Sequence, residues 1–343
     1  MASNTNFPVN LNIKPSHNSH DRHVLNAFDS SAQEAAIREY GIAGRVWEAA
    51  FFLNTYIEGL LDITFDPPFS TPHDEEKLLS ILELGSGTGI VSAKCAKQLS
   101  NRQCTVIATD LPEVCPLLAK NLCKYSEPEH ASGPRLLVRP LAWGNYEQAE
   151  AILHELKNTS DQIPANSGPN ALTHIICSDL IYFSELLAPL LRSLLHLTGP
   201  PFVSSSSTSD WPKIIISYKV RSLPTEMPFW SAFGLWFTFE PVLCRQSPPH
   251  RPNTSATGND PEARAGEALE NFEEPEEDTW RRFGSAGDDE VFVLVARRRP
   301  ESLVWDVPPD DVELLGGVGA SGTPSRKGDC TFETLLLMGM EGE

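Results

Sequence analysis

The sequence has few basic residues for its length, and its acidic residues outnumber them. Lys and Arg total 27 against 46 Asp and Glu among 343 residues, which gives a formal charge of −19. Binding to nucleic-acid phosphates or to an anionic membrane surface requires clustered Lys and Arg, and such clusters are lacking. We therefore expect no direct nucleic-acid binding and no membrane association, and this charge suits a basic partner better.

Long apolar runs, a signal peptide and paired cysteines are lacking as well. The stretch 186–197 is interrupted by Pro189, Arg192 and His196, whereas a membrane span needs roughly 18 apolar residues. The first 30 residues have neither the basic start nor the apolar core of a signal peptide. The seven cysteines form no Cys-x-x-Cys or Cys/His cluster, which favours buried free thiols over disulfides or zinc. The sequence predicts a cytoplasmic protein without a metal site.

The negative charge is concentrated in two short segments. Residues 260–278 hold nine carboxylates and one Arg, and residues 300–343 hold nine carboxylates and two basic residues. Both segments are also rich in polar residues and glycine or proline, which is typical of solvated chain. We expect a flexible segment over 1–30, one domain over 31–299 with a disordered acidic insertion over 246–279, and a mostly disordered acidic tail over 300–343. Only 332–338 in that tail has the composition of a small docked helix.

Between residues 77 and 218, short apolar or β-branched runs alternate with longer helical patterns. This alternation is typical of a parallel sheet with helices packed on it, an α/β fold. Strands are predicted at 79–84, 105–110, 136–140, 174–179, 213–218, 239–243 and 290–297. Helices are predicted at 90–99, 113–124, 147–156, 185–197 and 228–238.

A glycine-rich turn follows the first predicted strand, and carboxylates end two others. The turn reads Gly85-Ser86-Gly87-Thr88-Gly89, while Asp110 and Asp179 close the strands at 105–110 and 174–179. Such a turn lets the backbone approach a ligand closely, and the carboxyl ends of parallel strands gather at the ligand-binding crevice. A dinucleotide fingerprint needs a third glycine where Ile90 stands, which disfavours an NAD-dependent oxidoreductase.

Five motifs in this order resemble the seven-strand S-adenosylmethionine-dependent methyltransferases. Within them the chain resembles methyltransferase family 16, a group of protein-lysine methyltransferases that includes enzymes modifying chaperones and translation elongation factors. The motifs are Val46-Trp47-Glu48-Ala49-Ala50, Glu83-Leu84-Gly85-Ser86-Gly87-Thr88-Gly89, Asp110, Leu141-Ala142-Trp143-Gly144 and Ser178-Asp179-Leu180-Ile181-Tyr182. The resemblance covers about 46–297 and implies a Rossmann-like seven-stranded sheet with an antiparallel last strand and helices on both faces.

The resemblance also implies a cofactor, S-adenosyl-L-methionine, and residues that bind it. Trp47 and Trp143 would line the cofactor pocket, where an aromatic face suits an adenine ring and attracts a sulfonium. The other expected cofactor residues are Gly85, Ser86 and Gly87 below the methionine and ribose, Asp110 on the ribose hydroxyls with Leu111 beside it, Ser178, and Glu83 near a cationic group. For either tryptophan the alternative is ordinary core packing.

Asp179 and Tyr182 form the Asp-x-x-Tyr element that in this family lies beside the transferred methyl group. A free lysine side chain has a pKa of about 10.4 and must lose its proton before it attacks. We expect these two side chains to hold the amine in line, with burial lowering its pKa. The alternative is that Asp179 caps the following helix. The implied acceptor is a lysine of a protein, with an elongation factor as the favoured target.

Several interpretations stay open at the level of sequence. Lys219 and Arg221 are either a solvated strand end or a feature that steers the substrate, and 227–230 is either a substrate wall or core. The absence of an Asn-Pro-Pro-Tyr element weakens methylation of nucleic-acid bases. A small-molecule N-methyltransferase and a non-catalytic cofactor-binding module remain alternatives to a protein-lysine methyltransferase.

Overall fold

The computed structural model of this chain describes residues 12–16, 26–60, 62–71, 78–125, 133–160, 172–203, 211–246, 279–285 and 290–340. The predicted insertion over 246–279 lies outside the described residues except at its two ends. Most of the predicted flexible segment over 1–30 is outside them too.

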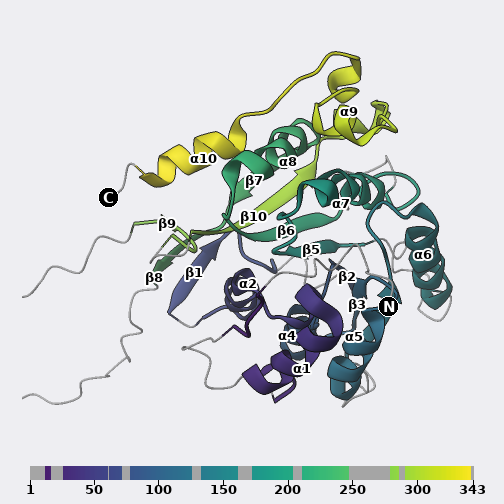
Figure 1. The fold of residues 1–343 in the computed structure, drawn as a ribbon, viewed down its shortest axis with the longest axis vertical. Coiled ribbons are helices and arrows are strands. Elements are labelled where there is room, and N and C mark those ends of the chain that lie inside the picture. The colour runs from purple at the N-terminus through teal and green to yellow at the C-terminus, as the bar shows by residue number, and fades with distance from the viewer. Residues whose placement is uncertain are drawn as a thin grey trace, which may run out of the picture.

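A seven-stranded sheet forms the centre of the molecule (Figure 1). Its strands are β4 (Arg135–Pro140), β3 (Cys104–Asp110), β2 (Leu79–Leu84), β5 (His174–Ser178), β6 (Lys213–Lys219), β10 (Val291–Arg298) and β7 (Phe237–Pro241), in that spatial order. Neighbours from β4 to β6 pair in parallel, whereas β10 runs antiparallel to both β6 and β7. This confirms the expected α/β fold with an antiparallel last strand.

The central strands are buried on both faces, which explains their continuous apolar runs. In β5, Ile175 and Cys177 belong to one core while Ile176 belongs to the other. The helices are α1 (Ser30–Tyr40), α2 (Glu48–Glu58), α4 (Ile90–Gln98), α5 (Cys115–Leu122), α6 (Tyr146–Ser160), α7 (Ser184–Leu197) and α8 (Leu223–Trp236), with α9 (Asp311–Leu315) and α10 (Thr331–Met340). Figure 1 shows α6, α7 and α8 on one face and α1, α2, α4 and α5 on the other.

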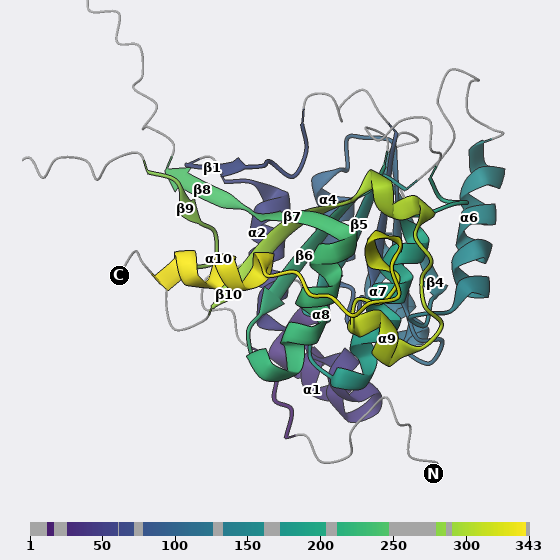
Figure 2. The same cartoon turned by 90° about the horizontal axis from the view of Figure 1, so that it is seen from above.

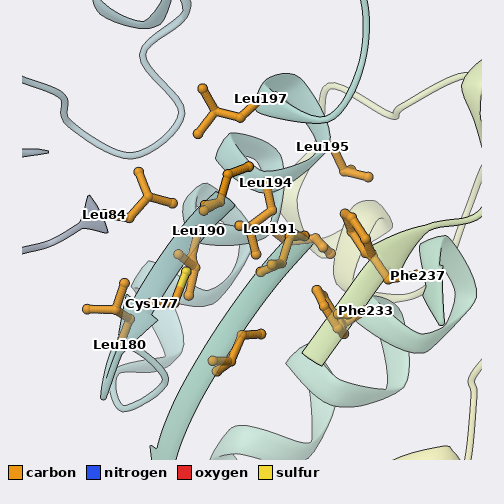
Figure 3. Packing of buried hydrophobic residues seen from close by; sticks show 14 of the residues in the cluster. Leu84, Cys177, Leu180, Leu190, Leu191, Leu194, Leu195, Leu197, Phe233 and Phe237 are labelled. Carbon is orange, nitrogen blue, oxygen red and sulfur yellow. The ribbon is translucent and has the colours of Figure 1, made fainter. Parts of the chain in front are cut away.

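Leucines of α7 pack this helix against β2 and β5, the two strands that precede the glycine turn and Asp179. Leu190, Leu191 and Leu194 pack toward Leu84 of β2 and Cys177 of β5 (Figure 3). Each of these side chains is at most 1% exposed. The carboxyl ends of β2 and β5 are therefore held against a close-packed layer, which fixes the position of whatever follows them.

A second, three-stranded sheet was not predicted. It contains β1 (Ile63–Asp66), β8 (Leu243–Gln246) and β9 (Arg281–Arg282), all antiparallel. The prediction of one strand over 239–243 is wrong, because this segment is divided between β7 and β8. The two strands are separated by Val242, which is buried and donates its N–H to the Val293 carbonyl. A strand of two to four residues gives too short a pattern for its period to be recognised.

The C-terminal residues depart most from expectation. Residues 300–340 carry the 3-10 helices η5 (Pro300–Val304) and η6 (Ala320–Gly322) as well as α9 and α10, and Figure 2 shows these last two helices along the side of α8. Leu314, Ala320 and Phe332 are at most 1% exposed and join the main core. The prediction of a mostly disordered tail is therefore wrong for residues 300–340. The few apolar residues of this segment are spaced so that they pack on one surface of the main core. The docked helix expected at 332–338 is confirmed as α10.

Three further short 3-10 helices lie in the described part of the chain, η1 (Asn26–Phe28) and η2 (Gly41–Gly44) around α1, and η3 (Cys123–Tyr125) directly after α5. Within the predicted flexible segment, Phe28 is 2% exposed and the N–H of Ser16 donates to the Gln33 side chain at 3.1 Å. Its described part is therefore packed, contrary to expectation. Cys95, Cys104 and Cys177 are buried thiols as expected, but Cys123 and Cys330 are exposed.

The described residues contain neither a membrane-spanning helix nor a cluster of side chains suited to a metal ion. No helix among them combines the length and apolarity needed to cross a membrane. In the same part of the chain, no group of three or more His, Cys, Asp or Glu side chains is placed to hold a metal ion.

Candidate functional site

The glycine turn after β2 has a backbone that side chains would obstruct. Gly85, Gly87 and Gly89 have φ values of 57°, 52° and 85°, which L-residues with a Cβ adopt rarely. A Cβ on Gly85 would lie 2.8 Å from Leu180 and 3.0 Å from Trp143, and one on Gly87 would lie 3.1 Å from the Ala43 carbonyl oxygen. Gly89 then caps α4. The turn thus forms a cradle in which these three positions require glycine.

Ser86 joins the glycine turn to β3. Its N–H donates to the Thr109 carbonyl at 2.8 Å, and its Oγ accepts from the Thr109 N–H at 3.1 Å. The side chain is largely used by the protein and is 7% exposed. Ser86 therefore sets the position of the turn relative to Asp110, the last residue of β3.

The Asp110 carboxylate lies under the turn. Oδ2 accepts from the Gly87 N–H and Oδ1 from the Leu111 N–H, each at 2.8 Å. Burial raises the pKa of Asp110 to about 6, although both backbone hydrogen bonds oppose the increase. Each carboxylate oxygen can accept a second hydrogen bond. This carboxylate thus offers two acceptors to a ligand, in agreement with the paired hydroxyls of a ribose.

Glu83 is a second carboxyl group in the same cavity. It is 2% exposed, and the Ser92 hydroxyl donates to Oε2. Burial raises the pKa of Glu83 to about 7, with the Ser92 hydrogen bond acting in the opposite direction. Such a group changes charge near neutral pH, and a bound cation would favour its ionised form.

Trp47 and Trp143 reach the cavity from two distant parts of the sequence. Trp47 lies between η2 and α2, and its Nε1 donates to the Ile42 carbonyl at 3.1 Å. The guanidinium groups of Arg45 and Arg221 lie 4.5 and 5.2 Å from the centre of its ring. Trp143 follows β4 and flanks Gly85. Both tryptophans are partly exposed into the cavity rather than enclosed in the core.

Asp179 follows β5 in a left-handed conformation, with a φ of 60°, while its N–H donates to the Ser217 carbonyl. Its side chain is fully buried, and both carboxylate oxygens accept from the Arg221 guanidinium. The helix-cap alternative is wrong, because α7 begins only at Ser184 and its cap residue is Phe183. The Ser178 hydroxyl accepts from the Ser217 hydroxyl at 3.3 Å.

Tyr182 completes this end of the cavity. Burial raises the pKa of its hydroxyl, with the nearby carboxylates of Asp110 and Asp179 adding to the effect. The hydroxyl therefore stays protonated and able to donate a hydrogen bond at any pH the protein meets.

All eleven residues predicted for the site line one cavity of about 470 Å³. They are Trp47, Glu83, Gly85, Ser86, Gly87, Asp110, Leu111, Trp143, Ser178, Asp179 and Tyr182. Arg45 and Arg221 also line this cavity, although neither was predicted as a site residue. The interpretation of Arg221 as a solvated strand end is wrong, since its guanidinium is ion-paired with Asp179 and its side chain is 29% exposed. The segment around Phe229 and Trp230 is core, because both are fully buried.

The fit of S-adenosylmethionine to these residues follows from the donor set and from the shape of the cradle. A glycine turn that a Cβ would fill, an acceptor pair at Asp110 and two tryptophan rings match a ligand with a ribose, a flat base and a sulfonium. The cavity volume lies within the usual range for small-molecule sites.

Comparison with known proteins gives curated relatives of one kind. The chain is 28% identical over 172 residues to protein-lysine N-methyltransferase EFM6 of Saccharomyces cerevisiae, 28% over 160 residues to EEF1A lysine methyltransferase 3 of Mus musculus, and 29% over 161 residues to the mouse protein N-lysine methyltransferase METTL21A. These matches cover 48%, 47% and 47% of this chain and 63%, 53% and 57% of the relatives. The chain thus spans between half and two thirds of the length of each.

A family model described as lysine methyltransferase matches residues 30–229, which is more than half of the chain. That span begins at α1 and includes the strands β2 to β6, so it contains all eleven predicted site residues. The chain therefore belongs to the lysine methyltransferase family of the seven-strand fold.

Proposed function

We propose that this protein transfers a methyl group from S-adenosylmethionine to the side-chain amine of a lysine in a protein. The observation that supports this proposal most directly is that a glycine cradle, two tryptophans and Asp110 line the same cavity as Asp179 and Tyr182. S-adenosylmethionine supplies an electrophilic methyl group on a positively charged sulfur. The cavity residues have to bind this donor, orient it and admit a neutral amine.

The cofactor half of the proposal depends on Asp110 and the two aromatic rings. With a pKa of about 6, Asp110 is ionised at neutral pH and its free acceptor positions suit two adjacent hydroxyls. Trp47 and Trp143 provide flat apolar surface for an adenine and attract a sulfonium. Glu83 lies deeper, where its charge would be favoured by a cationic group such as an α-amine.

The acceptor half depends on Asp179 and Tyr182. A lysine amine enters an apolar environment here, and burial lowers the pKa of an amine because it penalises the ammonium form. The protonated Tyr182 hydroxyl donates or accepts one hydrogen bond, and Asp179 accepts another. Two fixed partners restrict the direction of the nitrogen lone pair, which is the main requirement of an in-line displacement.

A translation elongation factor is the favoured acceptor within this proposal. One of the relatives carries the name EEF1A lysine methyltransferase 3. The formal charge of −19 also favours a basic partner over an acidic one. We place this reaction in the cytoplasm, where translation factors work.

Loss of the Asp179 carboxylate tests the proposed chemistry. In Asp179→Ala, we expect transfer to protein lysine to fall at least about 100-fold, because the amine loses a fixed partner. Calorimetry should give nearly wild-type affinity for S-adenosylmethionine, which also verifies folding. Near-normal turnover in this variant would remove Asp179 from the reaction.

Tritiated methyl donor and a cell extract identify the class of acceptor. Label in a protein band, located on lysine by mass spectrometry, supports the proposal, and enrichment in the EEF1A band supports the favoured target. Label only in small molecules would support a small-molecule N-methyltransferase, and binding of the donor without transfer would support a silent module. Calorimetric binding of NAD in place of S-adenosylmethionine would contradict both.

A further inference from the structure

Arg221 occupies both oxygens of the carboxylate that the proposed function assigns to the acceptor lysine. Its Nη1 lies 2.7 Å from Asp179 Oδ1, and its Nη2 donates to Oδ2. The Asp179 side chain is fully buried, and this paired geometry is the strong, directional form of an arginine–carboxylate interaction. Asp179 therefore faces the cavity as half of a neutral pair.

Residues behind Arg221 hold it in this position. Glu226 of α8 is 1% exposed, and its Oε2 accepts from the backbone N–H groups of Arg221 and Ser222 at 3.3 and 3.1 Å. The Tyr218 hydroxyl of β6 donates to the same oxygen. The Trp47 ring lies on the other side, 5.2 Å from the guanidinium carbon. Residues from three parts of the chain, α8, β6 and the start of α2, thus fix one cation beside Asp179.

An unpaired carboxylate at this position would oppose the reaction. It would favour the ammonium form of an incoming lysine and raise its pKa by about 1 to 3 units, whereas attack requires the free amine. A guanidinium on the same carboxylate cancels most of that attraction. Within the described residues, Oδ2 accepts from Nη2 alone, so one of its acceptor positions is unused. Because the side chain is fully buried, a neutral N–H reaches this position only if the edge of the Arg221 guanidinium moves aside.

We propose that Arg221 is a positioning residue for methyl transfer, which neutralises Asp179 so that this carboxylate orients the acceptor lysine without trapping it as an ammonium. The inference rests on the proposed function and adds a residue to it. The lysine first releases one proton to solvent. Its nitrogen lone pair then forms the N–C bond as the C–S bond breaks, the bonding electrons pass to sulfur, and the positive charge moves to nitrogen.

Other ionisable groups around the pair limit the pH range of a test. Besides Tyr218 and Glu226, those facing it or the adjoining cavity are Arg45, Glu48, Glu83, Asp110 and Tyr182. The pKa values of Asp110 and Glu83, about 6 and 7, place their titration below pH 8. Burial lowers the pKa of Arg221, but its hydrogen bonds to Asp179 together with the negative charges of Asp179, Glu48 and Glu226 outweigh this and raise it, so the guanidinium stays charged. Between pH 8 and 10.5 the acceptor lysine is the expected source of a rate change.

The experiment compares kcat across this pH range for the wild type, Arg221→Gln and Arg221→Lys, with purified EEF1A as the probe, or the labelled protein of the extract if EEF1A is not modified. In Arg221→Gln, we expect the rising limb of the profile to move up by about one pH unit or more. The rate should therefore fall about 10-fold at pH 8 and approach that of the wild type near pH 10.5. Arg221→Lys restores the charge, so its limb should lie close to that of the wild type.

Arg139→Gln is the matched control, because it breaks another arginine–carboxylate pair, with Glu155, outside the cavity. Its profile should equal that of the wild type, and calorimetry should show unchanged cofactor binding in all variants. An equal loss at every pH in Arg221→Gln would show a structural role only and overturn the inference, while Asp179→Ala could still support the proposed function. A wild-type enzyme that labels no protein would overturn both.

Discussion

Glu83 is a buried carboxyl group that should make the stability of the unliganded protein depend on pH. Its pKa is raised from 4.5 to about 7 by burial, so the folded state binds a proton that the unfolded state releases. This contribution to the free energy of unfolding is fully present below pH 4.5 and is lost as the pH rises through 7. Glu83→Gln keeps a partner for Ser92 but cannot ionise. Between pH 5 and 8 the free energy of unfolding of Glu83→Gln should therefore rise relative to that of the wild type, by a few kcal/mol as an order of magnitude.

Denaturant titrations at several pH values measure this difference. Because both proteins retain Asp110 and His196, whose pKa values are also shifted, these contributions cancel in the comparison. Glu155→Gln is a suitable control, since Glu155 is about a quarter exposed and its pKa is lowered by Arg139. A constant difference between wild type and Glu83→Gln across the range would show that the Glu83 carboxyl group is not strained by burial.

The cavity residues that belong to a sequence motif were predicted correctly. Arg221, a single charged residue outside any motif, was not. Gly85, Asp110 and Asp179 stand at strand ends, so the parallel order of the sheet brings them together. Arg221 stands outside any motif and looks like many surface arginines. Its assignment requires the three-dimensional fact that its side chain turns back toward Asp179, which no local pattern contains.

The helices and strands likewise divide into those that the sequence predicts and those that it does not. The strands β2, β3, β5, β6 and β10 were predictable because each contains a largely continuous apolar run that is buried on both faces of the sheet. By contrast, β1 and β9 gain their partner β8 from a distant part of the chain, and neither has a recognisable period of its own. For the elements after residue 300, acidic composition was a misleading guide, because a few well-placed apolar residues are enough to dock a short helix.

Phe332 is the most deeply buried of the described side chains of α10. It is 1% exposed, stacks on Trp230 at 4.4 Å and lies 5.8 Å from the Tyr218 ring. Phe332→Ala should lower the free energy of unfolding by about 3–5 kcal/mol, the usual loss for a buried Phe. Leu337→Ala on the same helix is the control, because Leu337 is 63% exposed and should change stability by less than about 0.5 kcal/mol. Equal effects in chemical denaturation would mean that α10 does not pack through Phe332.

At the scale of the whole molecule, the two acidic segments are not equivalent. Together they hold most of the formal charge of −19, yet residues 300–340 form part of the folded unit. One of their carboxylates, Asp311, pairs with Arg192 of α7 at 2.7 Å. The same arginine donates to the Pro308 carbonyl at 2.9 Å. The tail is thus attached by polar contacts at its rim and by apolar contacts at its centre.

Truncation after residue 299 should therefore destabilise the entire domain. It would remove Leu314 and Phe332 from the core, uncover Trp236, and take Ser302 away from the buried Arg298 guanidinium, which donates to its Oγ and carbonyl oxygen. A buried cation that loses partners and newly exposed aromatic surface both favour unfolding and aggregation. We expect a lower melting temperature and a smaller soluble yield than for a chain that ends at residue 340, measured by thermal unfolding and sedimentation. A truncated protein as stable as the full chain would mean that the tail is a separate attachment, and the domain would then be complete at β10.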